Sequence, residues 1–376
     1  MEVAVPNESQ PGEHRVAMVP EAIRRLAPKG IEVLVERGAG EGAGALDSAY
    51  EEAGAKLVAG EQVWGADVVA KVAPPSSEEI GRLRRGSVLV GFLAPLTSPE
   101  TTSALASAGV RAFAVEAIPR ITRAQSMDAL SSQSTVGGYR AALIAAQELG
   151  RFFPMLTTAA GTVRPAKVMV LGAGVAGLQA IATARRLGAI VSAFDVRSAV
   201  KEQIESLGAS FLELDLEADA EGSGGYAKQL DEDTQRRQQE LLADAIAEVD
   251  VVISTALIPG KPAPRLVTAD AVTRMKPGSV IVDLAGEAGG NCELTEPGET
   301  VVREDVTIAA PLNLPSTMAD HASQLYARNV QAFLELVTED GELKIDFEDE
   351  IVAGACITHD GEIVHEGAKQ AAGAGA

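Results

Sequence analysis

The stretch "KVMVLGAGVAGLQA", residues 167–180, predicts the fold around it. A Val-rich run leads into a G-x-G-x-x-G spacing, and an Ala-rich helical pattern follows. In this arrangement Gly172 makes a tight turn, Gly174 lets the backbone approach a pyrophosphate, and Gly177 lets the helix pack on the strand. Unpaired N–H groups at the start of the helix favour an anion. The stretch therefore predicts a dinucleotide site, and the strand–turn–helix context counts against a glycine-rich turn without a ligand.

A second apolar run, "AIVSAFD", ends at Asp195, about 20 residues after the glycines. A carboxylate at this strand end accepts hydrogen bonds from the adenosine ribose hydroxyls and repels a 2′-phosphate. Arg197 argues the opposite way, but Asp195 occupies the strand end itself, so we expect NAD(H) rather than NADP(H). The predicted cofactor-binding residues are Gly172, Ala173, Gly174, Val175, Gly177, Asp195, Val196 and Arg197.

Short apolar runs alternate with helical patterns along most of the chain. Runs such as "IEVLVE" and "SVLVGFL" are rich in Val and lack clean alternation, as in strands buried on both faces. The pattern between them, "PEAIRRLAPKG", opens with Pro and closes with Gly, as helices do. After the glycine motif, strands are expected at "ASFLELD", "VDVVIST", "GSVIVDL" and "VTIAAP". Near the C-terminus, Asp360-Gly361 between apolar runs predicts a hairpin.

Two long helical patterns divide the chain. One starts near residue 132 with "SQSTVGGYRAALIAAQELGRFF", and the other is "PSTMADHASQLYARNVQAFLELVTEDG". We therefore predict an α/β protein of two Rossmann-like lobes with parallel sheets, joined by long helices, with a cleft between the lobes. The first lobe takes residues 1–131 and 317–376, and the NAD-binding Rossmann lobe takes residues 132–316.

Composition limits the classes of function. The net charge of −21 over 376 residues argues against a nucleic-acid partner. Lysine is scarce, with 10 Lys against 22 Arg, which fits either a high-salt cytoplasm or an ordinary acidic protein from a GC-rich genome. No apolar run reaches the roughly 18 residues of a membrane span. The start, "MEVAVPNESQ", lacks the basic and apolar parts of an export signal, so a cytoplasmic protein is expected.

The cysteine and histidine positions predict no metal site. Cys292 and Cys356 lie far apart, as expected for reduced thiols, and no Cys/His cluster has zinc spacing.

A polar loop, "RITRAQSMDALSSQST" at residues 120–135, precedes the first long helix. It leaves a strand of the first lobe, so it can reach the expected cleft, where its amides and hydroxyls suit a carboxamide and a ribose. Alternatively it is a helix-capping loop, because Ser131 and Ser132 are good N-cap residues. Spacing alone does not choose between the two.

The charged stretch 216–240 breaks the alternation of strands and helices. It contains a Gly/Ser-rich segment and then "DEDTQRRQQE". It is typical either of a solvated loop followed by a helix, or of a mobile lid over a ligand anchored by Tyr226.

Four stretches together carry a family resemblance: "VAVPNESQPGEHRVAMVPE", "RITRAQSMDALSSQS", "GAGVAGLQAIATARRLGA" and "PLNLPSTMADHASQLYARN". With them the chain resembles, over nearly its whole length, the NAD(H)-binding component (domain I, alpha subunit) of the proton-translocating nicotinamide nucleotide transhydrogenases. The resemblance implies that the polar loop contacts the nicotinamide end of the cofactor through Arg120, Gln125, Asp128 and Ser131. It also places Tyr226 in a mobile loop that closes over the nucleotide.

That family is similar to the alanine dehydrogenases, which hold a keto acid with an arginine, a lysine and a histidine. Arg15 and Lys71 match the first two, whereas Phe92 stands at the histidine position. Phenylalanine cannot exchange a proton or bond a keto oxygen, which disfavours an amino-acid dehydrogenase. Arg15 and Lys71 are then either structural ion pairs or contacts to the cofactor.

Hydride transfer between two nicotinamides needs no general acid or base, which suits a site poor in histidine. The resemblance implies transfer from NADH to NADP⁺ held on a partner domain, coupled to proton translocation by a separate membrane domain. It also implies a homodimer, peripheral on the inner face of the membrane through its partners. The alternatives are an alanine-dehydrogenase-like enzyme acting without a partner, and an NAD-sensing subunit without catalysis.

Overall fold

The computed structural model describes residues 1–214 and 232–373. Tyr226 and the Gly/Ser-rich segment of the predicted lid lie outside these ranges. The chain forms two compact units, one of residues 1–133 and 315–376 and the other of residues 134–314, which we call the first and second units. Each unit is an α/β structure built on a mostly parallel sheet, so the predicted α/β, Rossmann-like fold class is confirmed.

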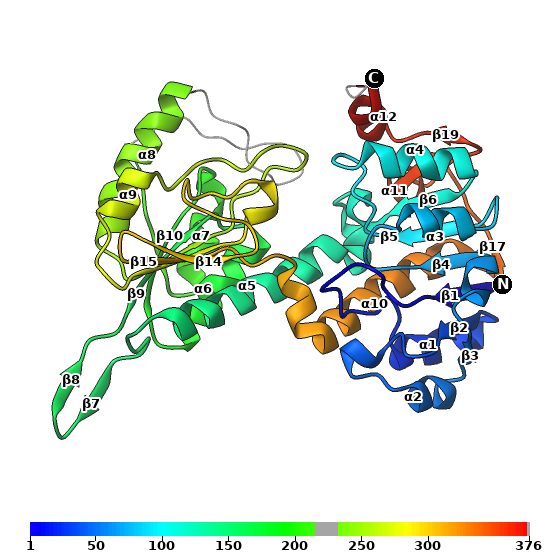
Figure 1. Ribbon diagram of the computed structural model, residues 1–376, viewed down its shortest axis with the longest axis horizontal. Coiled ribbons are helices and arrows are strands. Elements are labelled where there is room, and N and C mark those ends of the chain that lie inside the picture. Colours follow the sequence, from blue (N-terminus) through cyan, green and yellow to red (C-terminus); the bar gives the residue numbers. More distant parts are fainter. Residues whose placement is uncertain (215–231, 374–376) are drawn as a thin grey trace. The chain divides into compact units, whose positions relative to one another are not determined.

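In its described residues the first unit holds an eight-stranded sheet of order β19-β18-β6-β5-β4-β1-β2-β3 (Figure 1). The six strands from β6 to β3 are parallel neighbours. The strands are β1 (Glu2–Val5), β2 (Glu32–Glu36), β3 (Lys56–Val58), β4 (Val68–Ala70), β5 (Val88–Gly91), β6 (Arg111–Ala114), β18 (Cys356–His359) and β19 (Glu362–Ile363).

Helices cover both faces of this sheet. The evidence is that successive residues of a strand, which point to opposite faces, belong to two different apolar clusters. Val3 and Val5 of β1 join the cluster that includes Tyr326, whereas Ala4 joins the cluster with Leu105. Both faces are therefore buried, as the Val-rich runs predicted. The helices are α1 (Pro20–Leu26), α2 (Asp47–Glu52), α3 (Ser77–Arg82), α4 (Pro99–Ala108), α10 (Ala319–Leu336), α11 (Glu350–Ala355) and α12 (Glu366–Gly373).

The predicted C-terminal hairpin is confirmed. Asp360 and Gly361 both have positive φ, 48° and 84°, as a two-residue hairpin turn of the primed type requires. The hairpin adds β18 antiparallel to β6, so the sheet of the first unit is mixed rather than purely parallel.

The described residues of the second unit hold a seven-stranded sheet of order β11-β10-β9-β12-β13-β15-β14, parallel except for β14 at one edge. Its order reverses between β9 and β12, and in open α/β sheets ligands bind at such a reversal, beyond the carboxyl ends of the strands. The strands are β9 (Lys167–Leu171), β10 (Ile190–Phe194), β11 (Ser210–Phe211), β12 (Val251–Ser254), β13 (Val280–Asp283), β14 (Thr300–Arg303) and β15 (Val306–Ala309).

The helices of the second unit also divide between the two faces of its sheet. Val168 and Val170 of β9 share a cluster with α5 and α6, and Met169 shares one with α8 and α9. Gly138 of α5 allows a close approach, because a Cβ there would lie 2.0 Å from the Ala176 carbonyl oxygen of α6. The helices are α5 (Ala129–Glu148), which begins in the first unit, α6 (Val175–Arg186), α7 (Lys201–Ser206), α8 (Glu232–Ala247) and α9 (Ala269–Thr273).

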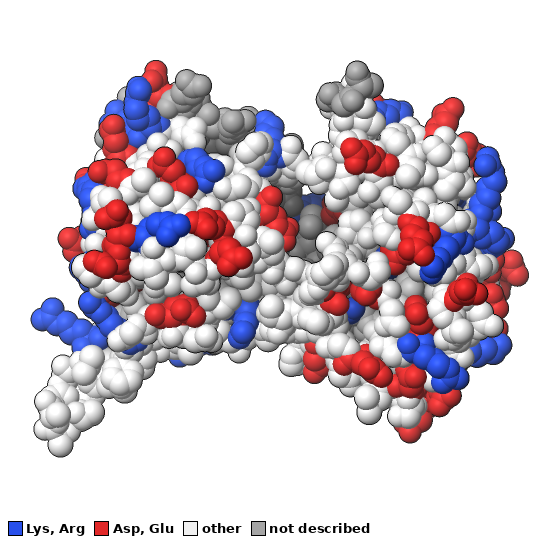
Figure 2. Space-filling model, in the orientation of Figure 1, with Lys and Arg blue, Asp and Glu red and all other residues white. Residues whose placement is uncertain are grey.

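A hairpin of β7 (Leu156–Thr158) and β8 (Gly161–Val163) extends from the body of the second unit (Figure 1). Apolar side chains on and beside it are exposed, namely those of Phe152, Met155 and Val163. Acidic side chains are spread over the visible face of each unit, often beside Lys or Arg (Figure 2).

Candidate nucleotide-binding site

Two glycines of the motif are required by the backbone around them. Gly172 has φ 93°, and a Cβ on it would lie 2.9 Å from the Thr255 hydroxyl oxygen. A Cβ on Gly177 would lie 1.9 Å from the Gly172 carbonyl oxygen. Any larger residue would therefore push α6 away from β9 or open the turn between them.

Gly174 differs from the other two glycines of the motif, because the space beside it is open. A Cβ there would meet no atom of the described residues within 4 Å, and φ of −73° suits any residue. Gly174 is the N-cap of α6, and among the described residues no side chain caps this helix end. The first turn of α6 carries no acidic residue. The space and the helix N-terminus together fit a pyrophosphate group.

Asp195 lies directly after β10 and is 8% exposed. Its Oδ2 accepts a hydrogen bond from the Ala173 N–H at 2.7 Å, which ties the end of β10 to the glycine turn. Arg197 donates three more, from its backbone N–H at 2.9 Å, its Nε at 2.8 Å and an Nη at 2.7 Å. The guanidinium is thus paired with the carboxylate, and ribose hydroxyls would have to share or displace these bonds.

Sequence reasoning missed the segment that follows β12. The Thr255 hydroxyl donates to the Gly172 carbonyl oxygen at 3.0 Å, and the Thr255 N–H donates to the Leu171 carbonyl oxygen at 2.8 Å. A Thr after a Val-rich strand carries no distinctive sequence signal. Its place beside the glycine turn follows only from the strand order.

The polar loop is a 3₁₀ helix, η5 (Thr122–Met127), followed by Asp128 and α5. Asp128 Oδ1 accepts from the Ser131 N–H at 2.8 Å, and Asp128 Oδ2 accepts from the Ser131 hydroxyl at 2.6 Å. Asp128 therefore caps α5, and the expectation that Ser131 or Ser132 is the N-cap is wrong. Ser131 and Ser132 lie inside α5, which begins at Ala129, and the Ser132 N–H already donates to the Asp128 carbonyl oxygen at 3.2 Å.

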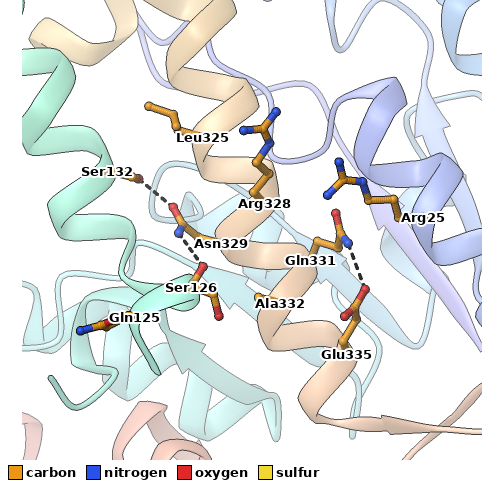
Figure 3. A pocket seen from close by; sticks show the side chains of 10 residues that line it. All are labelled: Arg25, Gln125, Ser126, Ser132, Leu325, Arg328, Asn329, Gln331, Ala332 and Glu335. Carbon is orange, nitrogen blue, oxygen red and sulfur yellow. Dashed lines mark hydrogen bonds between the residues drawn. The ribbon is translucent and has the colours of Figure 1, made fainter. Parts of the chain in front are cut away.

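Other residues of the loop are fixed to the first unit. Arg123 makes a two-pronged ion pair with Asp349 at 2.6 and 2.8 Å. Asn329 of α10 donates to the Ser126 carbonyl oxygen at 2.8 Å and accepts from the Ser132 hydroxyl at 2.7 Å (Figure 3). These contacts hold the loop backbone in place beside α10 and α11.

Of the four predicted loop residues, Asp128 and Ser131 are brought into direct contact by the capping bonds. Arg120 and Gln125 are exposed, and Figure 3 shows the Gln125 side chain directed away from the side chains of α10. A cavity of about 390 Å³ lies beside the loop. It is lined by Arg25, Gln125, Ser126, Ser132, Leu325, Arg328, Asn329, Gln331, Ala332 and Glu335.

Arg15 and Lys71 form buried ion pairs. Arg15 pairs with Glu13 at 2.6 Å and donates to Gln133 at 2.9 Å. Lys71 is fully buried, 3.1 Å from both Glu8 and Glu79.

The side chain at the histidine position of the alanine dehydrogenases is aromatic and packed. The Phe92 ring stacks on Tyr326 with ring centroids 5.4 Å apart. It therefore contributes packing on α10 and offers no group that could exchange a proton.

The described residues contain no group of three or more His, Cys, Asp or Glu side chains that could hold a metal ion. Cys292 and Cys356 are free and buried, and burial raises their thiol pKa values to about 11 and about 12. Such thiols stay protonated and unreactive near neutral pH. Within residues 1–214 and 232–373, no helix is long and apolar enough to cross a membrane.

The two-unit fold and the glycine turn define a dinucleotide-binding α/β protein. Comparison with known families is more specific: residues 4–137 match the alanine dehydrogenase/PNT N-terminal domain, and residues 141–366 match the alanine dehydrogenase/PNT C-terminal domain. The chain belongs to the alanine dehydrogenase/PNT family.

The similar proteins include both transhydrogenase subunits and alanine dehydrogenases. The chain is 50% identical to a protein of Rhodospirillum rubrum described as the first section of NAD(P) transhydrogenase subunit alpha, over 97% of this chain and 98% of that one. It is 36% identical to alanine dehydrogenase of Bacillus subtilis, over 85% and 80%. A solved transhydrogenase from Sinorhizobium meliloti has a TM-score of 0.86 at 46% identity, over 97% of this chain and 99% of that one. A solved L-alanine dehydrogenase has a TM-score of 0.85 at 28% identity, over 100% of each chain. The predicted resemblance to transhydrogenase alpha subunits and, more distantly, to alanine dehydrogenases is confirmed.

Proposed function

We propose that this chain is the NAD(H)-binding subunit of a proton-translocating transhydrogenase. It passes hydride from NADH to NADP⁺ held on a partner domain, and a separate membrane domain couples this step to proton movement. The observation that carries the proposal is the 50% identity to the Rhodospirillum rubrum subunit, which spans almost all of both chains.

The nucleotide binds along the carboxyl edge of the second unit's sheet in this proposal. Residues Gly172 to Gly177, including Ala173 and Val175, hold the pyrophosphate at the start of α6. Asp195, Val196 and Arg197 hold the adenosine ribose, and the Asp195 charge favours NAD(H) over NADP(H). Tyr226 falls outside the described residues and is proposed to close over the nucleotide.

The nicotinamide end contacts the polar loop through Arg120, Gln125, Asp128 and Ser131. The nicotinamide ring itself carries the hydride, so the loop residues need only orient the ring and keep water from it. Support comes from the rigid attachment of this loop to α10 and α11, which leaves Arg120 and Gln125 exposed. Groups on a fixed backbone suit a reaction that depends on ring position.

We further propose that the chain works as a homodimer, in the cytoplasm, peripheral to the inner face of the membrane through its partner domains. The exposed apolar residues on and beside the β7–β8 hairpin support contact with a second copy. Light scattering at micromolar concentration tests the dimer. A mass near 38.9 kDa, that of one chain, contradicts it.

The alternative is an amino-acid dehydrogenase, favoured by the buried Arg15 and Lys71 and by the similarity to alanine dehydrogenases. Phe92 opposes it, because the stacked ring offers no proton to a keto oxygen. The chain alone, mixed with NADH, pyruvate and ammonia, decides between them. We expect no NADH oxidation above background, and steady turnover without a partner overturns the proposal.

A further inference from the structure

A buried asparagine beyond β13 contacts the segment that follows β12. Asn291 is 0% exposed. Its Oδ1 accepts from the Ala256 N–H at 3.1 Å. Its Nδ2 donates to the Ala256 carbonyl oxygen at 2.9 Å and to the Pro264 carbonyl oxygen at 2.8 Å. One amide group therefore holds both ends of segment 256–264, with both of its N–H donors used.

Segment 256–264 begins at the carboxyl end of β12, next to the glycine turn. A Cβ on Gly172 would lie 3.1 Å from the Ala256 nitrogen, so the two backbones are nearly in contact. Since β9 and β12 flank the reversal of strand order, their carboxyl ends form the two walls of the ligand crevice. The glycine turn is one wall and segment 256–264 is the other. Leu257 on the second wall is 45% exposed, which leaves an apolar surface there.

The backbone around Asn291 is held independently of its side chain. The N–H of Cys292 donates to Asp283 Oδ2 at 3.0 Å, and the Asn291 carbonyl oxygen accepts from the Leu266 and Val267 N–H groups at 2.9 and 3.0 Å. Asp283 also accepts from the Ser254 hydroxyl at 3.0 Å. A change in the Asn291 side chain should therefore loosen segment 256–264, which keeps the bond from the Ala263 N–H to the Ala288 carbonyl oxygen at 2.9 Å, and leave the strand ends in place.

We propose that Asn291 is a positioning residue for nucleotide binding, which holds segment 256–264 as the second wall of the crevice. This inference rests on the proposed function only in requiring that the second unit binds NAD(H). A preformed wall spares the nucleotide the cost of ordering the segment, so losing the clamp lowers affinity. The three bonds are internal to the protein, so their loss weakens binding only through the cost of ordering the segment; a cost of about 1.4 kcal/mol or more corresponds to an affinity loss of about tenfold or more.

The test compares Asn291→Ala and Asn291→Asp with Thr183→Ala. The Asp variant keeps the side-chain volume but places an acceptor against two carbonyl oxygens, so it reports the hydrogen bonds rather than the packing, and it carries the test if the Ala variant does not fold. Thr183, buried in α6 and bonded within its own helix, is the matched control. NADH affinity is measured by fluorescence titration, and the folded fraction by denaturant unfolding without nucleotide.

We expect both Asn291 variants to bind NADH about tenfold or more weakly, while Thr183→Ala binds like the wild type. Hydrogen exchange in segment 256–264 should be faster in the Asn291 variants. Unchanged affinity per folded molecule in Asn291→Asp overturns the inference, even if the variant is less stable. A wild-type chain that does not bind NADH contradicts instead the proposed function.

Discussion

Among single residues, Asp195 carries the carboxylate that we propose selects NAD(H) over NADP(H). It accepts hydrogen bonds from Ala173 and Arg197, so the glycine turn and the segment after β10 are connected through one side chain. The pairing also directs the Arg197 guanidinium toward a carboxylate and away from the role of a 2′-phosphate ligand.

Asp195→Ala should weaken NADH binding by about 10- to 100-fold, because a hydrogen bond to a charged group contributes about 1.5–3 kcal/mol. It should also improve NADPH binding relative to NADH, since the repelling charge is gone and Arg197 is released. Titration of both reduced nucleotides, followed by fluorescence, gives the ratio. An unchanged NADPH-to-NADH preference would show that Asp195 does not discriminate between them.

A second prediction about a single residue concerns Glu116. Its Oε1 accepts from the Leu93 and Ala94 N–H groups at 2.8 and 2.6 Å, and its buried Oε2 has no hydrogen-bond partner among the described residues. Burial raises the pKa of this carboxyl above its ordinary value of 4.5. The folded chain therefore keeps a proton that the unfolded chain has lost, and stability falls as pH rises from 4.5 through the folded pKa.

Glu116→Gln keeps the Oε1 acceptor and does not ionise. The variant should match the wild type near pH 4 and become the more stable of the two as pH rises, by up to about 1.4 kcal/mol per pH unit across that window. Urea unfolding from about pH 4 to pH 7 measures the difference in the free energy of unfolding between the variant and the wild type. The contributions of the other carboxyl groups are the same in both proteins and cancel in this difference. Parallel stability curves would contradict the assignment.

Among the secondary-structure elements, the β9–α6 turn contains one glycine that is needed for folding, Gly177, and one that is proposed to be needed only for binding, Gly174. Gly177→Ala forces a Cβ against the Gly172 carbonyl and should lower the free energy of unfolding by about 1–3 kcal/mol. Gly174→Ala meets open space at an ordinary φ, so it should fold like the wild type but bind NADH more weakly. Melting curves and NADH titrations of the two variants check this. Normal NADH affinity in Gly174→Ala would show that the pyrophosphate does not bind beside Gly174.

Asn329 offers a prediction about the polar loop. Asn329→Ala leaves the Ser126 carbonyl and the Ser132 hydroxyl without their α10 partner, at a cost of about 1–3 kcal/mol. Hydrogen exchange at residues 120–131 should become faster, while exchange in the β9–α6 turn should not change. Equal exchange in variant and wild type would mean that Arg123 and Asp128 hold the loop without Asn329.

Elements with strong local patterns could be predicted from the sequence. Val-rich runs marked β2, β5, β12 and β13, and Asp360-Gly361 marked the hairpin. The edge strand β14 was missed, because Thr300–Arg303 is mostly exposed and lacks a buried apolar pattern. The cap of α5 was placed too far along the chain, since serine and aspartate cap equally well by propensity and only the geometry selects Asp128.

Only those residues of the candidate site that belong to a local sequence pattern could be predicted. Gly172, Gly174, Gly177 and Asp195 follow one another closely in a pattern with a physical meaning. Asn291 lies far along the chain from that motif and reaches the crevice through the strand order. No local pattern marks such a residue, because its partners are backbone groups of a segment distant in sequence.

For the molecule as a whole, the family includes two chemistries, and the site residues favour one of them. Phe92 packed on Tyr326 removes the proton donor that keto-acid chemistry needs. The glycine turn, Asp195 and the fixed loop of η5 remain suited to a nicotinamide nucleotide. A partner that holds NADP⁺ is therefore the requirement that most clearly distinguishes the proposed function from its alternatives.

The most direct test is hydride transfer from NADH to an NADP⁺ analogue with a shifted absorption band, measured with and without an added NADP-binding transhydrogenase domain. We expect rapid transfer only when that domain is present, and slower transfer with Gln125→Ala. Tight NADH binding without transfer in the presence of the domain would contradict the proposed function and would identify the chain as a nucleotide sensor.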